Sequence, residues 1–293
     1  MYEKFKGIFP ALLTPFNEDD SINFNALKQL VDRLIAQGVK GFYVDGSTGE
    51  AFLLTIEERK QLIRAVAEYA KGKCTLIAQI GSIALPDAIE LARCAESAGY
   101  DAISSVPPFY YKFNFAEIKR YYFTIADAVD LPMIIYNVPI YTGVSFTAEQ
   151  MGEFLQDDRF IGVKHTSSDY FALRQFRSAF PDKVMLNGFD EMLLAGLSLG
   201  ANGAIGSTYN FMPEKFIRIY ELFNKGQLEE AVCVQEEADR IIAALCKVGV
   251  MQGEKAILTK LGVPMGKLRA PFIDISDEQK EWLFDQILPL LSK

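Results

Sequence analysis

The chain has 293 residues, of which 50% are hydrophobic and 23% are charged, so it is long and apolar enough to bury a large core. A formal net charge of -8 and a sequence pI of about 4.9 leave no basic stripe, which argues against nucleic acid or an anionic membrane as a partner. Four scattered cysteines without a Cys-x-x-Cys pair, and the lack of a signal-like or membrane-spanning apolar stretch, predict a cytoplasmic protein with reduced thiols.

Short apolar runs typical of strands recur eight times, each followed by a polar turn and a segment with helical periodicity. The expected strands are residues 8–16, 41–46, 75–81, 102–108, 132–139, 160–166, 183–189 and 203–208. The expected helices between and after them are residues 23–37, 55–70, 84–98, 114–128, 146–155, 168–179, 189–199 and 213–223. Thr55 with Glu58, and Thr147 with Gln150, have the spacing of capping boxes.

This alternation predicts a parallel sheet covered by helices, and eight repeats allow it to close into a (β/α)8 TIM barrel, an α/β fold. An open doubly wound sheet is the competing architecture. That fold usually has a Gly-rich turn after its first strand, whereas residues 14–19 read Thr-Pro-Phe-Asn-Glu-Asp. Only helices are expected later, at 227–247, 253–261 and 277–291. We therefore predict a barrel with the active site at residues 1–223 and a small C-terminal helical extension beside it at 224–293.

Lys164 interrupts the apolar run that forms the sixth predicted strand. Such a lysine can end a strand with its ammonium in solvent, or it can be an amine kept in a dry site for covalent chemistry with a carbonyl. Tyr136, near the end of the fifth strand, is either a core residue or a carrier of protons to a substrate held by that amine. The carboxyl ends of barrel strands are where chemistry is expected, which favours the second interpretation of both residues.

Polar loops follow three other strands. Residues 46–50 (Gly-Ser-Thr-Gly-Glu) offer the hydroxyls of Ser47 and Thr48 and successive backbone N–H groups, which suit a carboxylate, although they are also ordinary turn chemistry. We expect Glu50 to be a structural partner. A phosphate site at residues 203–208 is less favoured, because no lysine or arginine flanks that segment closely.

The loop after the seventh strand carries an acidic pair, Asp190 and Glu191. Such a pair often begins a helix, but with Gly188 and Ser207 it would instead be able to bind several sugar hydroxyls. His165 is the only histidine, so multi-histidine zinc sites are absent, and strand alternation points it away from Lys164 into a packing role. We therefore predict no metal site.

Four motifs, at residues 46–50, 136–139, 162–164 and 203–208, resemble in order and spacing the dihydrodipicolinate synthase / N-acetylneuraminate lyase superfamily of pyruvate-dependent class I aldolases. The resemblance extends over essentially the whole chain. Within this superfamily the chain resembles the lyase branch. The synthases typically have an arginine shortly after the tyrosine motif, where this chain has Tyr141.

The resemblance implies reversible aldol cleavage of N-acetylneuraminate, a sialic acid, into N-acetylmannosamine and pyruvate through a Schiff base on Lys164. Tyr136 would move a proton, Ser47 and Thr48 would hold the pyruvoyl carboxylate, and no external cofactor would be required. The residues implied to hold the sugar chain are Thr166, Gly188, Asp190, Glu191 and Ser207.

The resemblance also implies a homotetramer built from two tight dimers, in which residues 107–111 send a tyrosine, Tyr110 or Tyr111, into a neighbouring site. A solvent-facing aromatic loop is the alternative for that segment. Alternative functions are another pyruvate-dependent aldolase (dihydrodipicolinate synthase or a 2-keto-3-deoxy sugar acid aldolase), an isomerase on a phosphate-binding barrel, or a non-catalytic keto-acid or sugar-binding protein.

Overall fold

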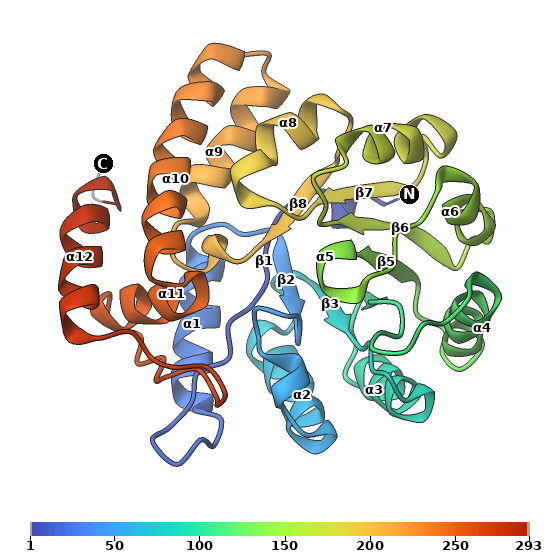
Figure 1. Ribbon diagram of the computed structural model, residues 1–293, viewed down its shortest axis with the longest axis horizontal. Coiled ribbons are helices and arrows are strands. Elements are labelled where there is room, and N and C mark those ends of the chain that lie inside the picture. Colours follow the sequence, from blue (N-terminus) through green and yellow to red (C-terminus); the bar gives the residue numbers. More distant parts are fainter. Residues whose placement is uncertain (1, 292–293) are drawn as a thin grey trace.

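The computed structural model describes residues 2–291, in which eight parallel strands form a ring at the centre of the molecule (Figure 1). The strands are β1 (Gly7–Pro10), β2 (Gly41–Val44), β3 (Thr75–Gln79), β4 (Ala102–Ser105), β5 (Met133–Asn137), β6 (Phe160–His165), β7 (Val184–Asn187) and β8 (Gly203–Gly206). Their order is β1-β8-β7-β6-β5-β4-β3-β2. A parallel bridge between Ala11 and Tyr43 joins the ends of this order. The predicted (β/α)8 barrel is confirmed, and the open sheet is wrong.

Every residue of the eight strands is buried, because side chains fill the inside of the ring and helices cover its outside. The inner core includes Phe9, Ile77, Ile134 and Leu186. Close strand packing is visible at Gly162 in β6, where a Cβ atom would lie 2.1 Å from the carbonyl oxygen of Val184. This packing makes the wall that carries Lys164 rigid.

Helices surround the barrel and follow the predicted pattern. They are α1 (Phe24–Ala36), α2 (Ile56–Ala70), α3 (Leu85–Ser97), α4 (Phe115–Ala126), α5 (Pro139–Thr142), α6 (Ala148–Leu155), α7 (Tyr170–Ala179), α8 (Leu193–Ser198) and α9 (Pro213–Asn224). The predicted capping boxes at Thr55 and Thr147 are both formed. The short α5 was not predicted, and residues 189–199 form two pieces, the 3-10 helix η3 (Asp190–Met192) and α8.

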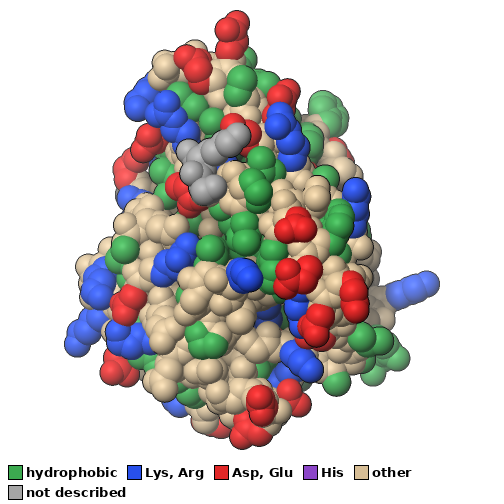
Figure 2. Space-filling view, turned by 90° about the vertical axis from the view of Figure 1, so that its left-hand side faces the viewer, with side chains coloured by type: hydrophobic (Ala, Val, Ile, Leu, Met, Phe, Trp, Pro, Cys, Tyr) green, Lys and Arg blue, Asp and Glu red, His purple; other side chains and the backbone are tan. Residues whose placement is uncertain are grey.

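The C-terminal part of the chain is helical, as predicted. It comprises α10 (Leu228–Val248), α11 (Val250–Lys260) and α12 (Asp277–Leu291), and α10 lies beside α9 on one side of the barrel (Figure 1). Gly249, with φ of 108°, separates α10 from α11, so α11 begins at Val250, earlier than expected. Viewed from the side of α12, acidic and basic side chains lie interspersed (Figure 2). Within residues 2–291, no helix combines the length and the apolarity that crossing a membrane requires.

Candidate active site

A cavity of about 590 Å³ opens at the carboxyl ends of the barrel strands. The ends of β2, β5, β6, β7 and β8 all contribute to it, because parallel strands of a barrel finish at the same rim. Every residue predicted for the site lines this cavity: Ser47, Thr48, Tyr136, Lys164, Thr166, Gly188, Asp190, Glu191 and Ser207. The fold therefore brings together side chains that are far apart in the sequence.

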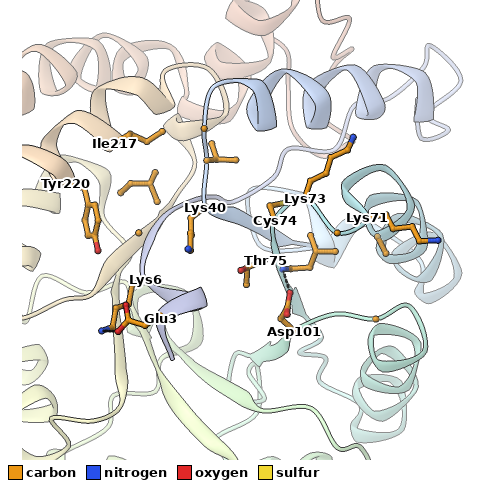
Figure 3. Close-up of a pocket in the computed structure, with 18 of the residues that line it drawn as sticks. Glu3, Lys6, Lys40, Lys71, Lys73, Cys74, Thr75, Asp101, Ile217 and Tyr220 are labelled. Atoms are coloured by element: carbon orange, nitrogen blue, oxygen red, sulfur yellow. Dashed lines mark hydrogen bonds and ion pairs between the residues drawn. The ribbon is translucent and has the colours of Figure 1, made fainter. Parts of the chain in front are cut away.

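A second cavity, of about 1010 Å³, lies at the amino ends of the strands (Figure 3). Lys40, Lys71 and Lys73 on its rim are exposed to solvent. Helices α1, α2 and α3 end on this side, and lysines there offset the negative ends of the helix dipoles. The helix dipoles therefore account for these lysines, and no bound ligand is needed to explain them. We place the chemistry at the opposite rim, where Lys164 is enclosed.

Lys164 lies in β6 and is only 4% exposed. Its Nζ is 3.9 Å from the centre of the Tyr136 ring and 4.1 Å from the centre of the Tyr43 ring. Burial lowers the pKa of Lys164 to about 7, although the negative charge of Asp190 opposes this change. At that pKa much of the amine is neutral near pH 7, and the neutral form is the one that attacks a carbonyl.

Tyr136 is the register neighbour of Lys164 across β5 and β6, and it too is buried. Burial raises the pKa of the Tyr136 phenol, and the neighbouring hydroxyls of Thr166 and Ser47 lower it in part. The phenol therefore keeps its proton at neutral pH. It is suited to donate or relay a proton, and not to act as a stored phenolate.

The loop at residues 46–50 is held in a tight turn beneath the cavity. The backbone N–H of Gly49 donates to the carbonyl of Gly46 at 3.0 Å, and the Thr14 hydroxyl donates to the Gly49 carbonyl at 2.7 Å. A Cβ atom on Gly46 would lie 2.9 Å from the Tyr43 ring. The turn therefore needs glycine at this position, because a side chain there would collide with the ring that also contacts Lys164.

Glu50 ends this loop in the left-handed region, with φ of 62°. Its carboxylate pairs with Lys255 at 2.7 Å and accepts the backbone N–H of Arg269 at 2.8 Å. Both Glu50 and Lys255 are buried. Glu50 is thus the structural partner that was expected, and the element it binds is α11 of the C-terminal part, which sequence reasoning did not foresee.

Asp190 lies almost completely buried after β7. One of its oxygens accepts the backbone N–H of Thr208 at 2.8 Å and the Thr208 hydroxyl at 2.6 Å. Burial raises the pKa of Asp190 to about 6. A Cβ atom on Gly206 would lie 1.9 Å from the other oxygen, so glycine is required there. Asp190 therefore begins the 3-10 helix η3, as an acidic pair often does, and also links the β7 and β8 loops through Thr208.

The other residues predicted on this side differ in exposure. Glu191 is exposed and faces the cavity, where its carboxylate is accessible to a ligand. Gly188 packs tightly under Thr166, because a Cβ atom there would lie 1.9 Å from the Thr166 hydroxyl. The site thus combines a fixed acid, an accessible acid and hydroxyls, an arrangement suited to a polyhydroxylated ligand.

His165 points away from the cavity, as strand alternation predicts. Its Nδ1 is 3.0 Å from the Asn137 amide and its Nε2 is 3.0 Å from the carbonyl of Asp169. Its ring packs edge-on against Phe176 of α7. His165 therefore packs between the sheet and a helix.

Two contributions to the site were missed from the sequence. Tyr43 packs against Lys164, and its place in an apolar strand, like that of Tyr136, is the signal that would have found it. The C-terminal part was expected to lie only beside the barrel, but it supplies an apolar wall through Ile242, Cys246, Val250, Met251 and Phe272. The rule that active-site residues lie at the carboxyl ends of barrel strands makes no prediction about these helices.

Residues 4–288 match the dihydrodipicolinate synthetase family, which covers nearly all of the chain. The chain belongs to that family. Among its relatives, the N-acetylneuraminate lyase of Rhizobium meliloti is 45% identical over 99% of this chain and 96% of that protein. The N-acetylneuraminate lyase of Clostridium perfringens is 44% identical over 94% of this chain and 96% of that protein.

Solved structures of family members have the same fold. CdNal from Clostridium difficile in complex with mannosamine is 40% identical and superposes with a TM-score of 0.96, over 98% of this chain and 99% of that one. N-acetylneuraminate lyase from Fusobacterium nucleatum complexed with pyruvate is 41% identical with a TM-score of 0.95, over 99% of this chain and 98% of that one. The resemblance noted in the motifs is confirmed at the level of the family.

Proposed function

We propose that this protein is an N-acetylneuraminate lyase, a class I aldolase that reversibly cleaves N-acetylneuraminate into N-acetylmannosamine and pyruvate. The observation that carries this proposal is Lys164, an enclosed amine with a pKa near 7 beside the phenol of Tyr136 and the hydroxyl loop at residues 46–50. The curated relatives reported above carry this activity in their names. No external cofactor is needed, since the amine itself forms the reactive group.

The reaction begins when neutral Lys164 adds to the ketone of the open-chain substrate and loses water, leaving a protonated imine. The bond between the third and fourth carbons then breaks, and its electron pair moves toward the imine to give an enamine. The hydroxyl at the cleaved bond loses its proton and becomes the aldehyde of N-acetylmannosamine. Protonation and hydrolysis of the enamine release pyruvate and restore the lysine.

In this proposal, Tyr136 takes the proton from that hydroxyl. Because the raised pKa of Tyr136 keeps the phenol protonated, it works as a relay. It passes its own proton toward the substrate carboxylate while it accepts the new one. Ser47 and Thr48, with the backbone N–H groups of their loop, hold that carboxylate next to the phenol.

The sugar chain lies on the other side of the cavity. Its hydroxyls are bound by Thr166, Gly188, Asp190, Glu191 and Ser207, all of which line the cavity. Tyr141, from α5, also lines it at the position where the synthase branch typically has an arginine. This arrangement favours an uncharged sugar over an amino-acid semialdehyde as the second substrate.

The proposed enzyme is a homotetramer in the cytoplasm, with its catalytic barrel at residues 1–223 and its helical extension at 224–293. Four free cysteines suit a reducing compartment. Tyr110 and Tyr111 are 84% and 64% exposed, and exposed aromatic side chains are typical of interfaces. Light scattering coupled to size-exclusion chromatography tests the assembly, and a monomer would contradict it.

Borohydride reduction in the presence of pyruvate, followed by peptide mass mapping, tests the activity. We expect a pyruvate-sized mass increment on the peptide that contains Lys164, and none in Lys164→Ala. Condensation of pyruvate with N-acetylmannosamine should exceed condensation with aspartate semialdehyde. Absence of the adduct would exclude a class I aldolase, and a preference for the semialdehyde would indicate the synthase.

A further inference from the structure

Glu254, in α11, is a carboxyl group that the reaction described above does not use. It is 0% exposed, and within residues 2–291 neither of its side-chain oxygens has a hydrogen-bond partner of good geometry. A buried carboxylate without partners is costly, so such a group favours its neutral form. Burial raises the pKa of Glu254 to about 8, so it is mostly a carboxylic acid at neutral pH.

The surroundings of Glu254 connect it to the sugar side of the cavity. The hydroxyl of Ser207 lies beside its carboxyl group, and the negative charge of Asp190, from η3, opposes its ionisation. On α11 itself, the next residue is Lys255, but that ammonium donates to Glu50 at 2.7 Å and to the carbonyl of Lys267 at 3.0 Å. No salt bridge to Glu254 is formed within the described part of the chain.

We propose that Glu254 is a positioning residue for sugar recognition, which donates its carboxylic proton to Ser207 Oγ and thereby leaves the Ser207 hydroxyl hydrogen free for the substrate. This inference rests on the role of Ser207 proposed above. Ser207 lines the cavity and Glu254 does not, so Glu254 acts through Ser207. When Glu254 loses its proton, Ser207 donates to the carboxylate instead, and a sugar hydroxyl loses its donor.

Glu254→Gln separates this role from a structural one, because the amide donates a hydrogen bond at every pH. In the native enzyme we expect the KM for N-acetylneuraminate to rise about three- to tenfold between pH 7 and pH 9, the cost of one hydrogen bond. Glu254→Gln should keep its pH 7 value within about twofold of native and show no alkaline rise. Glu254→Leu should show a raised KM already at pH 7, because leucine cannot donate to Ser207 Oγ and hold that hydroxyl in position.

The KM for pyruvate in the condensation reaction serves as the internal control, and we expect it to be the same in the three proteins at each pH. Ser207→Ala should have a raised sugar KM without the alkaline rise, and adding Glu254→Gln to it should change nothing further. An alkaline rise that persists in Glu254→Gln, or additive effects of the two substitutions, would overturn the proposal. Borohydride trapping with pyruvate in each variant distinguishes this failure from failure of the proposed reaction, which would abolish the Lys164 adduct everywhere.

Discussion

In the proposed reaction, the pKa of Lys164 sets the acid side of the rate profile for imine formation. A lysine with its ordinary pKa of 10.5 is about 0.03% neutral at pH 7, whereas a pKa of about 7 makes about half of the amine neutral. The neutral fraction then falls to about a tenth at pH 6 and about a hundredth at pH 5. The rate constant for imine formation with pyruvate should therefore drop about fivefold from pH 7 to 6 and level off above pH 8.

Asp190→Asn perturbs this profile in a defined direction. The charge of Asp190 raises the pKa of Lys164, so removing it should lower that pKa and move the inflection toward acid. Asparagine still accepts the two hydrogen bonds from Thr208, which preserves the loop. The profiles of Asp190→Asn and the native enzyme are best compared above pH 6, where Asp190 is charged, because the pKa of Asp190 itself is about 6.

Rapid quenching with borohydride, followed by intact-protein mass spectrometry, measures imine formation with pyruvate alone and thus avoids the sugar contacts of Asp190. Glu191→Gln is the matched control, since the charge of Glu191 does not contribute to the pKa of Lys164. Its profile should coincide with that of the native enzyme. An Asp190→Asn inflection at or above the native one would refute the electrostatic reasoning.

Other substitutions test the structure further. Lys164→Met should stabilise the fold by up to roughly 5 kcal/mol at and below pH 7. The gain should fade toward pH 10.5, because between these pH values the lysine of the native sequence is protonated in the unfolded chain but neutral in the folded one. Calorimetry that showed equal gains at pH 7 and pH 9.5 would contradict this. Lys255→Met leaves the Glu50 carboxylate buried alone and should cost about 3–5 kcal/mol in urea unfolding, against at most about 1 kcal/mol for Lys119→Met at an exposed pair. Gly206→Ala should displace Asp190 and reduce sugar turnover at least about tenfold, while pyruvate trapping on Lys164 persists. Unchanged turnover would show that the loop can accommodate the alanine methyl group without moving Asp190.

The fold was predictable because its signals are local and repeated. Each strand is buried on both faces and therefore reads as a continuous apolar run, and the capping boxes at Thr55 and Thr147 mark where helices begin. Boundaries were less predictable. The first apolar run continues to Phe16, yet β1 stops at Pro10, because residues beyond it form only isolated bridges with other parts of the chain.

The residues of the candidate site were predictable where they follow strands, since the topology alone brings strand ends to one rim. Glu254 and Lys255 were not, because they lie in a helix whose periodicity says only which face is buried. A buried charged residue in a helix looks the same in the sequence as an exposed one. Only the three-dimensional arrangement shows that one of them meets Glu50 and the other lies beside Ser207.

The attachment of α11 to the loop after β2 has a consequence for how the protein is made. All eight strands, with Lys164 among them, are synthesised before Lys255. Until then the Glu50 carboxylate lacks the Lys255 cation that holds it, and the turn proposed to receive pyruvate lacks its anchor. A gene fragment ending after α9 would therefore encode every residue that binds the substrate in the proposed reaction and still yield no working catalyst.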